Sequence, residues 1–180
     1  MTREIRAVRA RTTKPFGVDL LTASPRDMVP FVETICAEGA RAFVNWIGCA
    51  AGGCREEEVQ LVLTLLSEFS GAKEATVIGR SERLDALNAA LINSMSSASL
   101  AFNDTHNATV AHPTSPVAAA LLALAERQPL TGKELLHALI LGIEIQCRVG
   151  NILCVSPAES QVGLSVQGLL GGIGAAVAAA

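Results

Sequence analysis

The sequence predicts a mainly α protein, in which a helical, bundle-like domain is preceded by one short βα segment. Ala and Leu are abundant, tyrosine is absent and aromatic residues make up only 3% of the chain, a composition that favours helices over a β-sandwich. Apolar residues also recur at helical spacing in several long stretches. With 180 residues, the chain is long enough to bury a sizeable core, and one core is the default expectation.

The βα segment is predicted at the N-terminus. KPFGVDLL, residues 14–21, has a Pro-Phe-Gly turn followed by a short apolar run, as in an exposed turn that leads into a buried strand. Ser24 and Pro25, with Asp27 in the first turn, then predict the start of a helix. The basic run that precedes this segment is not followed by the apolar stretch of a signal peptide, so we expect a cytoplasmic protein.

Three helices and a short strand are predicted next. Residues 28–50 have helical apolar spacing and end at Gly52-Gly53, a helix stop. Residues 56–69 form a second amphipathic helix. Residues 75–78 are long enough only for an edge strand or a turn. A third helix is predicted from Ser81 to about Ala101, and its many small residues would allow neighbouring helices to approach closely.

Three further helices complete the predicted domain. The fourth runs from Pro116 to about Arg127, and the fifth begins at a capping box, Thr131 to Glu134, and reaches about Leu153. Residues 162–180 contain no charged side chain, but they are rich in Ala and Gly, which contribute little to membrane insertion. We therefore expect a buried helix that packs with the third and fifth helices, and no membrane span.

Charge and cysteine content exclude several classes of function. The formal net charge of −3 gives no basic surface for nucleic acid. The five cysteines show neither a C-x-x-C motif nor a Cys/His metal spacing, so we expect buried free thiols in a reducing compartment.

The loop at residues 103–115 gathers most of the groups that could carry chemistry. Asp104 could act as a general base or orient an imidazole, and His112 titrates near neutral pH and could give or take a proton. Thr105 could hydrogen-bond a substrate carboxylate, while Pro113 restricts the chain directly after His112. Such a loop between two helices is a common place for a site.

A purely structural role for the same loop remains open. Asn103 and Asp104 are common turn formers, and the Thr and Ser side chains before Pro116 are suited to capping the next helix. A metal site built from Asp104, His106 and His112 is less favoured, because their spacing matches no helical face.

Two features of the fifth helix are expected to be structural. We expect His137 to be a core or boundary residue, since Leu and Ala surround it. Glu144 and Arg148 stand four residues apart and should form an ion pair that adds little stability.

From about residue 45 to 180 the chain resembles the N-terminal helical domain of the 2-methylcitrate dehydratase (MmgE/PrpD) family, which also includes cis-aconitate decarboxylase. The segments that carry the resemblance, in order, are NWIGCAAGG, EATVIGRSERLDALNAALINS, AFNDTHNATVAHPTSPVAAALLALAE, GKELLHALILGIEIQCRVG and GLLGGIGAAVAAA.

This resemblance implies a lyase that acts on small tricarboxylic acids without a metal or organic cofactor. It also implies a homodimer whose subunits have a large helical and a smaller α/β domain. Family members are more than twice as long, so we expect a truncated member. The family's loop places a Thr and a His in the active site. The resemblance therefore implies active-site roles for Thr105 and His112, with Asn103, Asp104 and Pro113 as the matching frame. Together with the chemistry of the loop, we expect His112, Thr105 and Asp104 to be catalytic and Asn103 and Thr105 to bind substrate.

Two positions depart from the family pattern. Ala101 stands where the family commonly has an aspartate, and Ser165 stands where a histidine is often found. A site that lacks an acid and a base need not run the family reaction. A catalytically inactive remnant of the helical domain is therefore the alternative hypothesis.

Residues 1–43 resemble instead a piece of the nitronate monooxygenases, which are flavin-binding TIM barrels. One βα unit cannot close a barrel or hold a flavin, so a fragment of such an oxygenase is the third hypothesis. We expect a foreign segment over residues 1–43, a junction near Arg41 to Asn45 and the helical domain over residues 44–180. Because the domain would be incomplete, we also expect exposed apolar surface and self-association.

Overall fold

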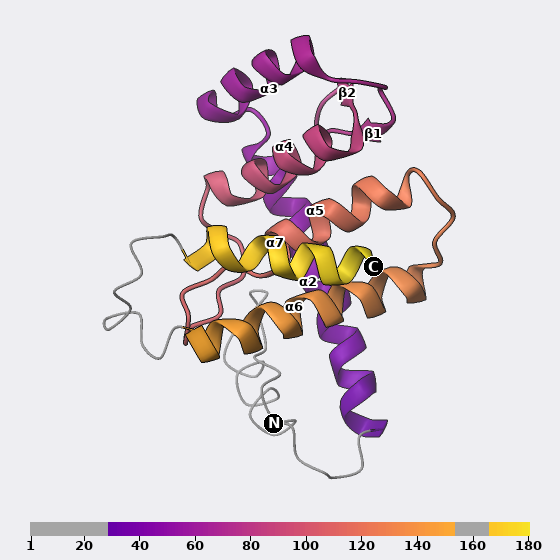
Figure 1. Ribbon diagram of the computed structural model, residues 1–180, viewed down its shortest axis with the longest axis vertical. Helices are drawn as coiled ribbons and strands as arrows, with labels where there is room; N and C mark the ends of the chain where they lie inside the picture. Colours follow the sequence, from indigo (N-terminus) through magenta and orange to yellow (C-terminus); the bar gives the residue numbers. More distant parts are fainter. Residues whose placement is uncertain (1–28, 154–165) are drawn as a thin grey trace.

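The computed structural model describes residues 29–153 and 166–180 of the chain (Figure 1). The strand and helix start predicted before residue 28 lie outside these residues. The described part is mainly helical, as predicted. Its elements in order are α2 (Val29–Gly53), α3 (Glu57–Phe69), β1 (Ala75–Thr76), β2 (Arg83–Leu84), α4 (Ala86–Ser99), α5 (Thr114–Ala125), α6 (Gly132–Leu153) and α7 (Val166–Ala179).

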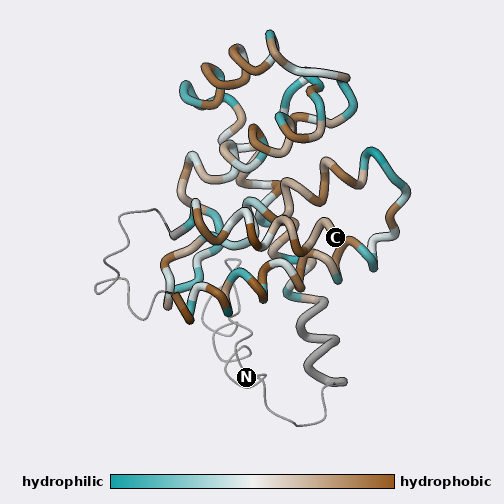
Figure 2. Tube along the Cα trace, in the orientation of Figure 1, coloured by the Kyte–Doolittle hydropathy of each residue, from teal (hydrophilic) through white to brown (hydrophobic). Residues whose placement is uncertain are grey.

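The helices form two packed groups, and α2 and α5 of the second group also pack against α4 of the first (Figure 1). In the first group, α3 and the antiparallel β1–β2 hairpin pack over α4 around a core that includes Val59, Leu63 and Ile92. In the second group, α5, α6 and α7 pack with α2 around Trp46 and Leu139. Apolar and polar residues alternate along α6 in Figure 2, as expected for a helix with one buried face.

The packing order differs from the one predicted. We expected the third and fifth helices to pack together with the C-terminal segment, but α4 packs against α2, α3 and α5, whereas α7 packs against α5 and α6. α5 therefore lies between α4 and the α6–α7 pair. Its sequence allows this, because small residues on both sides, including Ala118, Ala119 and Ala123, are buried.

Helix α2 runs without a break from Val29 to Gly53, and so it continues through the predicted junction at residues 41–45. The domain boundary after residue 43 stays a prediction. The C-terminal end of α2 lies very close to α4, since a Cβ atom added at Gly53 would lie 2.1 Å from the main-chain oxygen of Ser96. The predicted role of small residues in close helix packing is seen at this contact.

The third helix begins later than predicted, because Arg83 and Leu84 pair with β1 before the helix can start. Asp85 is the N-cap of α4, and its carboxylate accepts hydrogen bonds from the amides of Leu87 and Asn88, both at 3.1 Å. These amides, together with the Ser70 hydroxyl, hold the pKa of Asp85 well below its usual range.

Replacing Asp85 with alanine is expected to lower the free energy of unfolding by about 1 kcal/mol, the usual cost of losing an N-cap. Asp85→Asn keeps an acceptor and should lose less. Because the pKa of Asp85 is lowered in the folded state, its contribution is present above the unfolded-state pKa and is lost as the pH falls below it. Urea titrations of both variants at neutral and acidic pH would check this. An Asp85→Ala protein as stable as the wild type would contradict it.

The capping box at the start of the fifth helix is confirmed. The amide and hydroxyl of Thr131 donate to the Glu134 carboxylate at 2.8 and 2.7 Å, and the Glu134 amide donates to the Thr131 hydroxyl at 3.2 Å. The predicted pair of Glu144 and Arg148 is also present.

His137 is exposed on α6, so its predicted core or boundary position is wrong. It lies on the polar side of an amphipathic helix.

The apolar C-terminal segment forms α7, whose Leu170 is fully buried, as expected for a core helix. Among the described residues, α6 is the one helix long and apolar enough to cross a membrane by length and composition. Core helices of helical domains pass the same test, and α6 packs against α2, α5 and α7. The cytoplasmic location stays a prediction.

Candidate functional site

The predicted site loop leaves α4 through Ala101 and closes on itself before α5 begins. Ala101 and Val110 both have a φ of 54°, a left-handed conformation that is uncommon for alanine and costly for a β-branched residue. Between them, the His106 amide donates to the Ala111 carbonyl at 2.8 Å, which forms an antiparallel bridge. The buried imidazole of His106 lies 2.7 Å from the Thr109 hydroxyl, so this histidine stabilises the loop.

The imidazole of His112 is oriented by the loop. Its Nδ1 lies 2.8 Å from the main-chain oxygen of Asp104 and 3.3 Å from the hydroxyl of Thr105. A carbonyl oxygen can only accept, so Nδ1 carries the proton of the neutral ring. Within the described part of the chain Nε2 has no hydrogen-bond partner, which leaves its lone pair unshared.

Asp104 has two separate roles in this geometry. Its main-chain oxygen orients the His112 ring, while its carboxylate accepts from the amide and hydroxyl of Thr114 at 3.2 and 2.8 Å. The carboxylate thus satisfies a free amide at the start of α5. α5 therefore begins two residues before the predicted Pro116, because Asp104 caps it from within the loop.

Burial raises the pKa of Asp104 above its ordinary value, although Thr114 and His112 partly offset the effect. The thiol of Cys49, on α2, is half-buried, and its pKa is raised by burial and then by the negative charge of Asp104. Cys54 is a buried free thiol, as predicted, and Cys147 is also buried.

Asp104→Asn is expected to make stability less dependent on pH. Since the folded-state pKa of Asp104 is raised, the folded protein holds this proton more tightly than the unfolded chain does. Stability due to this group is therefore full below the unfolded-state pKa and falls as the pH rises through the folded-state pKa. The asparagine variant keeps an acceptor for Thr114, so its stability relative to the wild type should rise over this window. Chemical unfolding at several pH values would check it, and a constant difference would contradict it.

The two remaining predicted positions differ in what surrounds them. Asn103 is half-buried, and its side-chain nitrogen is buried without a hydrogen-bond partner in the described structure. Ala101 is exposed. Ser165 lies outside the described residues. Among the residues that the structure describes, no three His, Cys, Asp or Glu side chains are grouped so that they could hold a metal ion.

A cluster of serine hydroxyls supports the start of α5. The Ser115 hydroxyl lies 2.6 Å from that of Ser97 and 3.1 Å from that of Ser94, both on α4. The prediction that Thr and Ser serve the helix start is confirmed in part, because Thr114 and Ser115 anchor it through their side chains. The sequence showed the many serines of α4 but not which of them meet.

Gln167 is a site residue that the sequence analysis missed. Its side-chain amide accepts from the His112 amide at 2.7 Å and donates to the His112 carbonyl at 3.0 Å, across 55 residues of chain. The one available signal was that Gln167 is the only amide side chain within the otherwise apolar α7.

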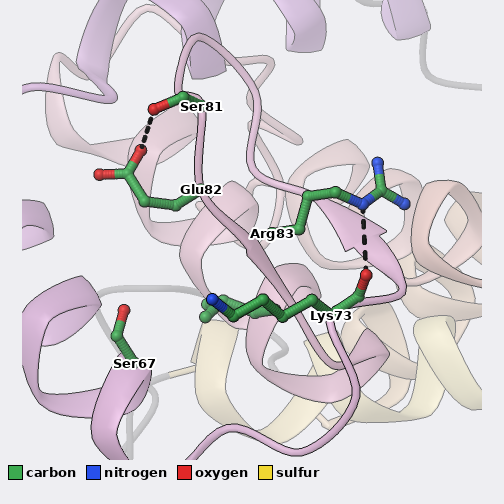
Figure 3. Close-up of a pocket in the computed structure, with 6 residues that line it drawn as sticks. Ser67, Lys73, Ser81, Glu82 and Arg83 are labelled. Atoms are coloured by element: carbon green, nitrogen blue, oxygen red, sulfur yellow. Dashed lines mark hydrogen bonds between the residues drawn. The ribbon is translucent and has the colours of Figure 1, made fainter.

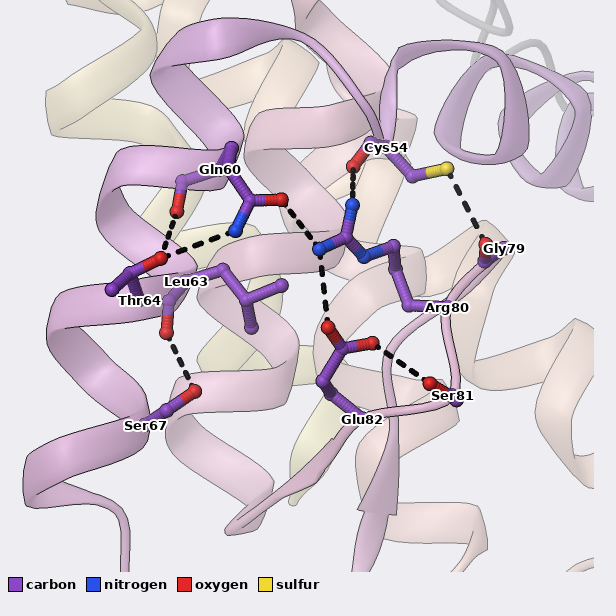
Figure 4. Close-up of polar contacts among 9 residues, drawn as sticks. All are labelled: Cys54, Gln60, Leu63, Thr64, Ser67, Gly79, Arg80, Ser81 and Glu82. Carbon is purple, nitrogen blue, oxygen red and sulfur yellow. Dashed lines mark hydrogen bonds and ion pairs between the residues drawn. The ribbon is translucent and has the colours of Figure 1, made fainter.

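A surface pocket of about 470 Å³ lies elsewhere, between α3 and the β1–β2 hairpin (Figure 3). Its cationic Arg83 is already paired with Glu126 and with the Lys73 carbonyl. Nearby, the Arg80 guanidinium joins the carbonyl of Cys54 to the side chains of Gln60 and Glu82 (Figure 4). These contacts hold the hairpin against α3 and against the turn that follows α2.

The His112 loop and its supporting helices all fall within one family match. The model of the MmgE/PrpD N-terminal domain matches residues 29–180. The chain belongs to the MmgE/PrpD family. No match is found among curated proteins. The match to MmgE/PrpD confirms the resemblance and begins upstream of the predicted start at residue 45, so residues 29–43 of α2 lie within it. The resemblance of the N-terminal residues to nitronate monooxygenases stays a prediction.

Proposed function

We propose that this MmgE/PrpD domain is the N-terminal part of a lyase that dehydrates or decarboxylates a small tricarboxylic acid, such as 2-methylcitrate. The observation that carries the proposal is the anchored ring of His112. Its Nδ1 is bonded to the Asp104 main chain, which leaves Nε2 free to exchange a proton with substrate.

In the proposed dehydration, His112 Nε2 removes a proton from the carbon next to a substrate carboxylate. The electron pair forms the carbon–carbon double bond as the hydroxyl on the adjacent carbon leaves. This hydroxyl takes the abstracted proton back from the His112 imidazolium and departs as water, which returns the imidazole to its neutral form. The Asp104 main-chain oxygen, 2.8 Å from Nδ1, holds the ring so that Nε2 is the nitrogen that meets the substrate.

Two hydrogen-bond donors of the loop are suited to bind the substrate. The Thr105 hydroxyl is exposed beside the His112 ring, and the Asn103 side-chain nitrogen has no partner in the described structure. A buried donor without a partner is costly, and a substrate carboxylate oxygen would satisfy it. This supports the substrate-binding roles of Asn103 and Thr105.

A catalytically inactive helical domain is the second candidate. It is favoured by Ala101, which brings no carboxylate to the loop, and by the use of the Asp104 carboxylate as a helix cap. In this case the polar groups of the loop would serve only to connect α4 and α5.

The proposal includes self-association, and a homodimer is the form that family membership favours. Leu61, Leu65 and Phe69 are exposed at four-residue spacing along α3, with exposed fractions of 66%, 56% and 74%. Such a stripe is the kind of surface that a second protein surface covers. Light scattering after size-exclusion chromatography would test this, and a monomer at all concentrations would contradict it.

The test of function is an ultraviolet absorbance assay of the purified full chain with 2-methylcitrate, citrate and cis-aconitate. Formation or loss of an unsaturated tricarboxylate changes the absorbance. A saturated tricarboxylate without a hydroxyl group serves as the control, since it cannot lose water. Turnover of one acid and not of the control is expected. No change with any acid supports the inactive domain, and a yellow preparation supports the flavin-dependent hypothesis.

A further inference from the structure

Gln167 holds His112 in an arrangement that no other described side chain shares. One planar amide makes two hydrogen bonds to the main chain of a single residue, with Oε1 accepting at 2.7 Å and Nε2 donating at 3.0 Å. Because both bonds close on the same residue, they fix the orientation of its two peptide groups as well as its position.

The position of Gln167 is itself fixed by the packing of α7. The fully buried Leu170 lies against α6, where a Cβ atom added at Gly150 would meet it at 2.8 Å. A Cβ added at Gly171 would lie 3.1 Å from Pro116 of α5. These contacts leave α7 little freedom to slide or rotate, so its first turn is held beside the His112 loop. The loop, the end of α6 and the start of α7 lie at the same end of the molecule (Figure 1).

The loop alone would hold the ring less firmly. The His112 ring is hydrogen-bonded at one nitrogen only, because Nδ1 lies 2.8 Å from the Asp104 carbonyl oxygen and 3.3 Å from the Thr105 hydroxyl. Gln167 contacts the main chain of His112 and not its ring. Its main chain follows a bridge at Ala111 that is a single residue pair long. A short bridge and one ring contact leave the residue able to turn, and the amide of Gln167 removes that freedom.

We propose that Gln167 is a positioning residue for His112. Its two hydrogen bonds to the His112 main chain keep the imidazole Nδ1 on the Asp104 carbonyl, and they thereby leave Nε2 free for substrate. The chemistry of the site is thereby tied to the docking of α7. The inference rests on the proposed role of His112, but its main test does not require turnover.

The test compares two variants in the full chain. Gln167→Met has a similar length and makes neither bond, while Gln167→Glu keeps the acceptor but, when ionised, cannot donate to the His112 carbonyl. ¹⁵N NMR of the histidine rings reports which nitrogen carries the proton. The His112 signals are assigned by their absence from His112→Ala, and His106 and His137 serve as internal references.

In the wild type we expect the Nδ1–H form of His112 at neutral pH. In Gln167→Met we expect a mixture of the two His112 tautomers. In Gln167→Glu we expect a smaller share of the Nε2–H form than in Gln167→Met. The signals of His106 and His137 should stay unchanged in both variants. If the chain turns over a tricarboxylate, kcat should fall about 10- to 100-fold with a small change in KM. Leu169→Ala, at an exposed position of the same helix, is the matched control and should behave as the wild type.

Two results would overturn the proposal. One is an unchanged His112 tautomer, measured by ¹⁵N NMR, in a Gln167→Met protein that circular dichroism shows to be folded. The other is an equal change in Leu169→Ala, which would show a general response to altering α7. If Gln167→Met does not fold, Gln167→Glu decides the question by the same spectrum. A wild-type chain with a fixed His112 tautomer but no turnover would reject the proposed function and leave the positioning role standing.

Discussion

Replacing His112 with alanine is expected to lower the turnover of a tricarboxylate by about 10²- to 10⁴-fold, the usual contribution of a general acid–base group. The fold should survive, because the ring is only half-buried and its hydrogen-bond contacts are limited to the Asp104 main-chain oxygen and the Thr105 hydroxyl. The measurement is the initial rate of the ultraviolet assay at saturating substrate, together with a thermal unfolding curve for each protein.

His137→Ala is the matched control for this prediction. It removes the same side chain from an exposed position on α6, away from the loop, and should leave both rate and stability unchanged. Equal rates for His112→Ala and the wild type would show that His112 is not the base. Equal losses in the two variants would show that the effect is not specific to the site.

Gly53→Ala is expected to lower the free energy of unfolding by about 3 kcal/mol, at the upper end of overpacking costs. The added Cβ would lie 2.1 Å from the main-chain oxygen of Ser96 and 3.3 Å from the Cβ of Ser99. A main-chain atom cannot move aside as a side chain can, so α2 and α4 would have to separate. Urea titration monitored by circular dichroism would measure the loss.

Gly48→Ala gives the opposite expectation in the same helix. A Cβ atom at this position meets no atom within 4 Å, and the residue lies inside α2. Alanine is a better helix former than glycine, so the variant should gain about 0.5–1 kcal/mol. If both variants change stability in the same direction, close packing of α2 on α4 is not what requires glycine at position 53.

The helices were predictable because their signals are local. The capping box at Thr131 fixed the start of α6 in the sequence, and Gly52-Gly53 fixed the end of α2. The start of α4 was misplaced by the hairpin, since Arg83 and Leu84 become a strand only through pairing with residues 75–76. That pairing depends on a partner strand, and a strand of two residues is too short to show an alternating apolar pattern in the sequence.

The candidate site was predictable in part for the same reason. The sequence placed Asp104, Thr105 and His112 in one loop, and family membership supports their proposed roles. It indicated the Asp104 carboxylate as the group that orients the imidazole, whereas the structure uses the Asp104 carbonyl and assigns the carboxylate to Thr114. Sequence spacing does not show which oxygen of a residue faces which partner.

By itself, then, the sequence determined the helical class, most helix bounds, the site loop and the family resemblance, because periodicity, caps and motifs are properties of neighbouring residues. Only the tertiary structure decided that α5 separates α4 from the α6–α7 pair and that Gln167 holds His112. Those contacts join residues far apart in the chain, and they form only where close packing at glycines such as Gly150 and Gly171 brings α7 to the loop.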